Sequence, residues 1–155
     1  MNFDQAFIQL IGHEGGYVDD RRDPGGETKY GISSRAYPAV DIHALTLEGA
    51  KLIYFRDYWG PAGCDVVPDS IKFDLFDMAV NSGVRPAIKL LQAVVQTTQD
   101  GVLGPKTLQA VNSMDKTKLA VRYNAGRLEF YTTLSTWPAF GKGWVRRIAA
   151  NLRSI

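Results

Sequence analysis

Residues 2–17 read NFDQAFIQLIGHEGGY, and this stretch sets the first helix and the turn that follows it. Apolar side chains recur at helical spacing along one stripe, namely Phe3, Phe7, Leu10 and Ile11, with Ile8 at its edge. Asn2 is a suitable N-cap and Gly15-Gly16 is a suitable stop, so the pattern predicts an amphipathic helix with Glu14 in its last turn. Unpaired carbonyl groups at that end of a helix disfavour an ionised carboxylate and raise its pKa.

Glu14 is therefore the first candidate for a catalytic group. A carboxylic acid that stays protonated near neutral pH can donate a proton to the leaving oxygen of a glycosidic bond. The alternative is that Glu14 is an exposed polar residue at a helix end, where a carboxylate is destabilising by roughly 0.3–1 kcal/mol. The unfavourable position itself favours the functional interpretation.

Four stretches in order carry a resemblance to a known family. They are residues 14–17 (EGGY), 23–33 (DPGGETKYGIS), 54–59 (YFRDYW) and 76–83 (FDMAVNSG). Together they resemble the motif blocks of the glycoside hydrolase family 108 muramidases, of phage endolysin or secretion-activator type. The resemblance implies a mainly α, lysozyme-like fold with a small irregular or β-hairpin insertion after the first helix. It also implies an N-acetylmuramidase that cleaves the β-1,4 bond between N-acetylmuramic acid and N-acetylglucosamine in peptidoglycan.

A glycosidase needs a second catalytic group, and Asp23 is the leading candidate. The gap between Glu14 and Asp23 is the one that phage-type lysozymes show, whereas Thr28 follows one residue sooner than in those enzymes. On that resemblance Glu14 donates the proton, Asp23 orients or activates the attacking water and Thr28 helps to hold it. Asp19 and Asp20 are rivals for the second role. An Asp before Pro-Gly-Gly is also a common turn starter, which is the structural alternative for Asp23.

Further residues are candidates for binding the substrate. Tyr17 and Tyr30 offer flat apolar faces to sugar rings, although each could equally belong to the core. Trp59 is better explained as a core residue. Asn81 lies one helical turn after Asp77 on an apolar helix, and the resemblance places Asn81 in the cleft.

The C-terminal half has its own motif. Residues 100–107 (DGVLGPKT), preceded by Leu91-Gln92, resemble a turn of helical peptidoglycan-binding modules. A tight turn before a proline-initiated helix also suits any small helical fold. The expected domains are a catalytic muramidase lobe at residues 1–84 and a peptidoglycan-binding-like helical lobe at residues 85–155, packed as one compact unit.

Caps and breakers predict where the helices begin and end. The insertion at residues 17–33 is a loop or a small hairpin, because two glycine-containing turns interrupt it. The predicted helices run from Thr46 to Tyr58 with a stop at Gly60-Pro61, from Asp69 or Ser70 to Asn81, from Pro86 to Thr98, from Pro105 to Val111, from Asp115 to Leu134, and from Pro138 and Gly141 onward.

Charge is segregated along the chain. Residues 1–66 carry a net charge of −4, residues 67–114 are balanced, and residues 115–155 carry +6. A basic C-terminal third is attracted to anionic polymers, and the peptidoglycan glycan strand is the expected partner. The basic amphipathic helix at residues 144–155 docks on the core in one interpretation and contacts an anionic membrane in the other. No nucleic-acid motif accompanies the charge, so no nucleic-acid partner is expected.

Composition bounds the remaining possibilities. Cys64 is the single cysteine, and His13 and His43 are the only histidines, so neither a disulfide nor a metal site is expected. No cofactor is implied, and a monomer is expected. The N-terminus lacks a standard signal peptide, which predicts synthesis in the bacterial cytoplasm and action in the periplasm or cell wall after release through a holin or a secretion route.

Three alternative functions remain open from the sequence. A lytic transglycosylase would use Glu14 alone and release a 1,6-anhydro sugar. A related hydrolase would act on chitin-like polymers, and a non-catalytic wall-binding protein would assist secretion.

Overall fold

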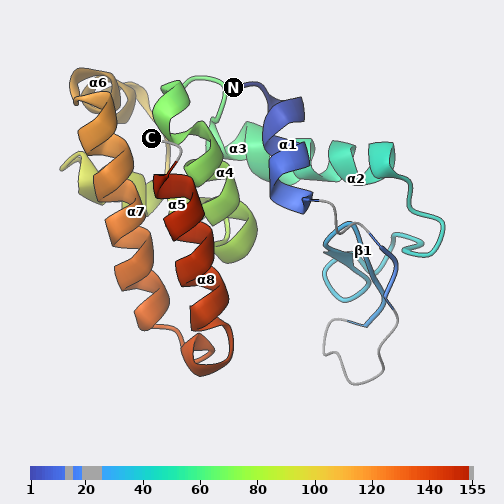
Figure 1. The fold of residues 1–155 in the computed structure, drawn as a ribbon. Coiled ribbons are helices and arrows are strands. Elements are labelled where there is room, and N and C mark those ends of the chain that lie inside the picture. The colour runs from blue at the N-terminus through green and yellow to red at the C-terminus, as the bar shows by residue number, and fades with distance from the viewer. Residues whose placement is uncertain (13–15, 19–25, 154–155) are drawn as a thin grey trace. The chain divides into compact units, whose positions relative to one another are not determined.

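The computed structural model describes residues 1–12, 16–18 and 26–153 (Figure 1). The chain divides into two compact units, one of residues Asn2–Asp57 and the other of Met1 with Tyr58–Ile155. Most of the described residues are helical, and a small antiparallel hairpin follows the first helix. The prediction of a mainly α chain with an early hairpin insertion is therefore confirmed.

The first helix, α1, spans Phe3–Ile11 and begins as predicted. The Asn2 side chain accepts a hydrogen bond from the Gln5 amide (2.9 Å), and the Gln5 side chain accepts one from the Asn2 amide (3.0 Å). This reciprocal capping satisfies two amides that would otherwise be unpaired. The predicted end at Gly15-Gly16 is wrong, because Gly12 takes a positive φ of 57° and ends the helix after Ile11.

The hairpin pairs β1 (Thr28–Lys29) with β2 (Ile32–Ser33). Thr28 lies opposite Ser33, and Lys29 lies opposite Ile32. The turn between the strands, Tyr30-Gly31, has positive φ angles of 51° and 76°. The Tyr54 hydroxyl donates to the Tyr30 carbonyl (3.1 Å), and a side chain at Gly31 would collide with that hydroxyl. Glycine is therefore required here for both conformation and space.

A long helical stretch connects the two units in sequence. Helix α2 (Leu47–Tyr54) begins at the predicted cap, where the Thr46 hydroxyl accepts from the Gly49 amide (3.1 Å). It continues as a π-helix, η1 (Phe55–Trp59), and then as α3 (Gly60–Ala62). The predicted stop at Gly60-Pro61 is wrong, because proline is tolerated in the first turn of a helix, where its missing N–H has no acceptor to lose.

The remaining helices form the second unit. They are α4 (Asp69–Ser82), α5 (Val84–Val94), α6 (Pro105–Ser113), α7 (Lys116–Thr132) and α8 (Trp137–Leu152). Asp115, the predicted start of this helix, caps α7 by accepting from the Lys118 amide (2.8 Å). Pro86 and Pro138 lie inside the first turns of α5 and α8, so these helices begin before the predicted residues. Helix α5 also ends earlier than predicted, and Gln96, just beyond it, has a φ of 59°.

The core of the second unit lies between α4, α5, α7 and α8, which run beside one another in Figure 1. Trp59 is fully buried, as predicted, and packs edge-to-face on Phe76 with ring centroids 5.4 Å apart. Ile148 of α8 is 1% exposed, which agrees with the interpretation that α8 docks its apolar side on the core. Among the described helices, none is long and apolar enough to cross a membrane.

A charged cluster is buried in this core. Arg127 of α7 is fully buried; its Nη1 donates to Asp74 of α4 (3.1 Å) and its Nη2 donates to Asp77. Arg147 of α8 also donates to Asp77 (2.7 Å). Side-chain amides of α7 and α8 complete the shell of Asp74, from Asn124 at 2.8 Å and Asn151 at 2.7 Å. The cluster joins three helices.

Burial and charge act on these groups in opposite directions. Burial raises the pKa of Asp74, and the nearby Arg127 guanidinium limits that rise. Burial alone would lower the pKa of Arg127, but Asp77, Tyr131 and Asp74 together raise it. Arg127 therefore stays charged, and its charge offsets the cost of burying the carboxylates.

Candidate functional site

The predicted catalytic carboxylates lie outside the described residues. This holds for Glu14 and Asp23, and for the rival candidates Asp19 and Asp20. Helix α1 ends at Ile11, three residues before Glu14 in sequence. What the structure describes is the frame on either side of these residues.

Thr28 is held where two segments of the chain meet. The Thr28 and Val18 backbones exchange two hydrogen bonds of 2.8 Å in an antiparallel bridge. The Thr28 hydroxyl donates to the Gly26 carbonyl (3.3 Å). The hydroxyl hydrogen is donated locally, while the oxygen can still accept a hydrogen bond from a water or a substrate. Thr28 is partly exposed.

Tyr17 lies beside the same bridge, next to Val18 in sequence. Its hydroxyl donates to Glu27 Oε1 (3.0 Å), and its ring meets the His43 ring edge-on with centroids 5.2 Å apart. Tyr17 is 39% exposed. The ring is thus oriented by a partner at each end while part of its surface remains open to solvent.

Tyr30 occupies the hairpin turn two residues beyond Thr28. The Tyr30 carbonyl is held by Tyr54, and the Lys29 ammonium lies 5.7 Å from the centroid of the Tyr30 ring. Lys29 also donates to the His43 carbonyl (2.9 Å). The structure therefore brings Tyr17, Thr28 and Tyr30 together around one hairpin.

Asn81 belongs to the other compact unit, on α4. Its amide donates to the Asp77 carbonyl (2.7 Å) and to Asp77 Oδ1 (3.1 Å). Asn81 is exposed, whereas Asp77 is fully buried. The predicted shared face is correct, and Asn81 forms the solvent end of the buried charged cluster. Its place in a substrate cleft stays a prediction.

One carboxylate of the first unit was missed by sequence reasoning. Asp57 accepts from Arg56 Nε (2.6 Å) and Nη2 (2.8 Å) and from the Tyr37 hydroxyl (3.0 Å). The hydrogen bond from Arg56 is the main reason why the pKa of Asp57 is lowered. Asp57 is therefore ionised, and it holds the Arg56 and Tyr37 side chains rather than donating a proton. The adjacent Arg-Asp pair in YFRDYW was the available signal.

The described residues offer neither a reactive thiol nor a cluster of metal ligands. Cys64 is fully buried, and burial raises the pKa of its thiol to about 12. A neutral buried thiol is a poor nucleophile. Within residues 1–12, 16–18 and 26–153, no group of three or more His, Cys, Asp or Glu side chains is arranged to hold a metal ion.

The Asp100-Gly101 motif forms a turn that is locked from beneath by Gln92. The buried Gln92 amide donates to Asp100 Oδ1 (2.7 Å), the Val102 carbonyl (3.0 Å) and Thr107 Oγ1 (3.3 Å), and its oxygen accepts from the Gly101 amide (2.9 Å). The polar groups of this motif therefore form hydrogen bonds that stabilise the turn. A cavity of about 670 Å³ lies beside this turn, lined among others by Lys106.

Comparisons with known proteins agree with the sequence motifs. A family described as Glycosyl hydrolase 108 matches residues 7–83. A second family, described as Predicted Peptidoglycan domain, matches residues 86–149. No curated protein matches the chain.

A solved structure extends the likeness to nearly the whole chain. The structure titled "Structure of Brucella abortus SagA" is 36% identical in sequence, with a TM-score of 0.87. The match covers 98% of this chain and 92% of that one. It confirms the predicted lysozyme-like fold.

Proposed function

This chain belongs to the glycosyl hydrolase 108 family, and we propose that it is an N-acetylmuramidase that hydrolyses the β-1,4 bond between N-acetylmuramic acid and N-acetylglucosamine. The family and the C-terminal match make it a glycoside hydrolase that acts on peptidoglycan. Beyond this, we propose which glycosidic bond is hydrolysed and which residues catalyse its hydrolysis.

In the proposed mechanism Glu14 is the general acid. Its carboxyl proton passes to the glycosidic oxygen as the bond to the anomeric carbon breaks. Asp23 takes a proton from the water that attacks the same carbon, and the Thr28 oxygen accepts a hydrogen bond from that water. Protons balance, because Glu14 loses the one that the leaving sugar gains and Asp23 gains the one that water loses.

The observation that supports this proposal most directly is the Val18–Thr28 bridge. It ties together the two ends of the segment in which Asp23 stands, and Glu14 precedes Val18 by four residues. The same bridge holds Thr28 and neighbours Tyr17, whose partly exposed ring offers an apolar face to a sugar. Tyr30 is the second proposed aromatic contact.

Asn81 and the C-terminal half complete the proposal. Asn81 is proposed to contact the substrate from α4, and residues 85–155 to retain the enzyme on the wall. The protein is proposed to act as a monomer in the periplasm or cell wall, after release through a holin or a secretion route. We also propose that the basic helix α8 contacts an anionic membrane.

The Glu14→Gln variant tests the mechanism. The amide keeps the shape of the side chain but has no acidic proton, so release of soluble products from purified peptidoglycan should fall by at least about 100-fold. Mass spectrometry of the products should show reducing-end N-acetylmuramic acid from the wild type. Asp23→Asn should cause a smaller loss.

The matched control is Glu48→Gln, the same change at an exposed position in the first turn of α2. It should release products at the wild-type rate. Anhydro ends from the wild type would instead identify a lytic transglycosylase. Unchanged product release by Glu14→Gln would remove Glu14 from the mechanism, and an inactive Asp19→Asn or Asp20→Asn variant would reassign the base.

A further inference from the structure

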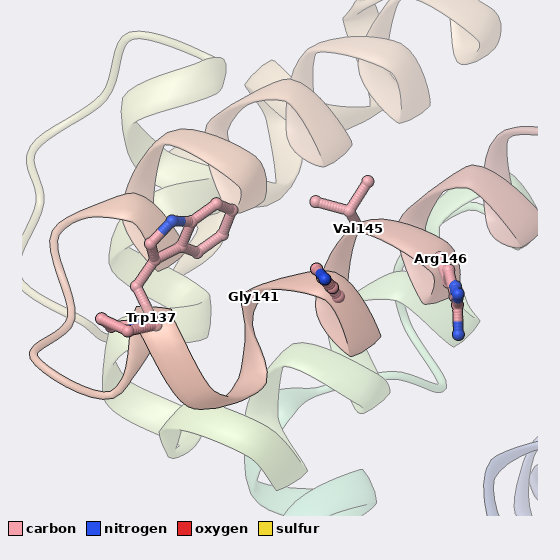
Figure 2. Close-up of a pocket in the computed structure, with 6 residues that line it drawn as sticks. Trp137, Gly141, Val145 and Arg146 are labelled. Carbon is pink, nitrogen blue, oxygen red and sulfur yellow. The ribbon is translucent and has the colours of Figure 1, made fainter.

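A groove of about 400 Å³ runs along one side of α8 (Figure 2). Its lining comes from three successive turns of the helix, namely Trp137, Pro138, Gly141, Lys142, Val145 and Arg146. The volume falls within the range of small-molecule binding sites, about 300–1,000 Å³. The groove is thus large enough to take a sugar with part of an attached peptide.

The floor of the groove includes a fixed aromatic ring. The Trp137 indole lies directly against the backbone of Gly141, so that a Cβ atom there would come within 2.7 Å of Trp137 Cδ2. Trp144 lies beside Trp137 with ring centroids 6.2 Å apart, and Trp144 in turn stacks on Tyr131 at 4.8 Å. The indole is partly exposed. It is a preorganised flat surface of the kind on which the apolar face of a sugar ring can lie.

The wall of the groove is positively charged. Lys142 and Arg146 line it one helical turn apart, and no acidic side chain is among the lining residues. Both are exposed, and neither forms an ion pair with another residue in the described part of the chain. The neighbouring Arg147 differs, because it is paired with the buried Asp77. Two cations beside a flat ring therefore match a ligand that joins a sugar to carboxylates.

We propose that this groove binds the peptide-bearing muramic acid of peptidoglycan, with the sugar against Trp137 and the carboxylates of the stem peptide on Lys142 and Arg146. The inference rests on the proposed function, in that it takes peptidoglycan as the ligand of the C-terminal half. A concave site suits a sugar-peptide better than a bilayer, because Ile148, in the apolar stripe of α8, is buried in the core.

The test is equilibrium binding of a soluble disaccharide-tetrapeptide to the full chain. Replacing both cations, as Lys142→Gln with Arg146→Gln, should weaken binding at least about tenfold, or about 1.4 kcal/mol. Lys118→Gln with Arg122→Gln is the matched control, since it removes a Lys and an Arg at the same spacing from exposed positions on α7. The control should change affinity by less than about twofold.

Three further measurements separate the contribution of the ring from that of the charges. Gly141→Ala places a methyl group under the indole and keeps both cations, so it should weaken binding while circular dichroism remains native. Trp137→Leu should do the same. With the stem-peptide carboxylates converted to amides, the wild type and the Lys142/Arg146 double variant should bind equally weakly.

Several outcomes would overturn the inference. Binding of the disaccharide-tetrapeptide by the Lys142/Arg146 double variant at wild-type strength would do so, as would no binding by the wild type. If the Lys142/Arg146 double variant lost binding only to phosphatidylglycerol vesicles, the groove would be assigned to membrane contact instead. Reducing-end release from sacculi, measured in parallel, reports on the proposed hydrolysis separately, because groove-dependent binding can stand whether or not the chain cleaves the strand.

Discussion

Arg127 forms ion pairs with two carboxylates, Asp74 and Asp77, which stand three residues apart on α4. All three side chains are almost completely removed from water. Removing one partner of such a cluster costs more than the cluster itself contributes, because the charge left behind stays buried without a counter-charge.

Arg127→Met is therefore expected to lower the free energy of unfolding by roughly 3–5 kcal/mol. Urea denaturation followed by circular dichroism measures this change. Arg122→Met, at an exposed position on the same helix, should cost less than about 0.5 kcal/mol. Equal losses in the two variants would contradict the importance of the buried cluster.

Cys64 gives a prediction in alkaline solution. Its thiol pKa is raised from 9.0 to about 12 by burial, so the folded chain holds the proton at a pH where the unfolded chain releases it. The stability that this thiol contributes is present below pH 9.0 and is lost as the pH rises toward 12. A thiol-specific reagent should react with Cys64 only after unfolding. Fast labelling of the native protein would show that the thiol is accessible.

At the level of helices and strands, local signals predicted the structure well where they act within a few residues. The caps predicted at Asn2 and Thr46 were correct because each side chain bonds an amide three residues away. Prolines and glycines were less reliable. Pro61 was interpreted as a stop although it begins a helical turn, and Gly12 ended a helix whose predicted stop was Gly15-Gly16.

The site was predictable only in part, because some of its contacts join residues that lie far apart in the sequence. Tyr17, Thr28 and Tyr30 all fall within the loop or hairpin predicted at residues 17–33, and the Val18–Thr28 bridge in it is local in sequence. The bond between Asp74 and Arg127 links residues 53 positions apart, and the orientation of Gln92 depends on a loop that returns to it. Such contacts depend on tertiary packing, which no local pattern specifies.

The loop after α5 provides a prediction at the scale of an element. Gln92→Leu removes every hydrogen bond that the buried amide makes to the Asp100–Thr107 turn and leaves the Gly101 amide without that partner. We expect a loss of about 1–3 kcal/mol in stability and faster hydrogen exchange at Gly101 and Val102. Gln109→Leu, the same change at an exposed position of α6, should leave exchange in the turn unchanged. Slow exchange in both variants would show that the turn holds without Gln92.

The distribution of charge belongs to the molecule as a whole. The net charge is +2, yet residues 115–155 carry 8 basic against 2 acidic side chains. Attraction between this third of the chain and an anionic wall acts through solvent, and salt shortens its range from about 10 Å at 0.1 M to about 3 Å at 1 M.

Retention of the full chain on purified sacculi should therefore fall several-fold between roughly 0.05 and 0.5 M sodium chloride. A sedimentation assay with the Glu14→Gln variant measures retention without loss of the wall by cleavage. The Lys118/Arg122 double variant should shift the whole curve slightly toward lower salt. Retention that is independent of salt would mean that wall binding does not use this charge.

The buried cluster of Asp74, Asp77 and Arg127 has a consequence for how such genes recombine. The two carboxylates lie in the segment matched by the hydrolase family, and the guanidinium lies in the segment matched by the peptidoglycan family. A shuffled gene that joined residues 1–84 to a foreign C-terminal half without basic residues in place of Arg127 and Arg147 would leave Asp74 and Asp77 buried without a counter-charge. Exchange of one half for a foreign one therefore requires that the buried charges of the two halves match. A chimaera without matching charges is expected not to fold.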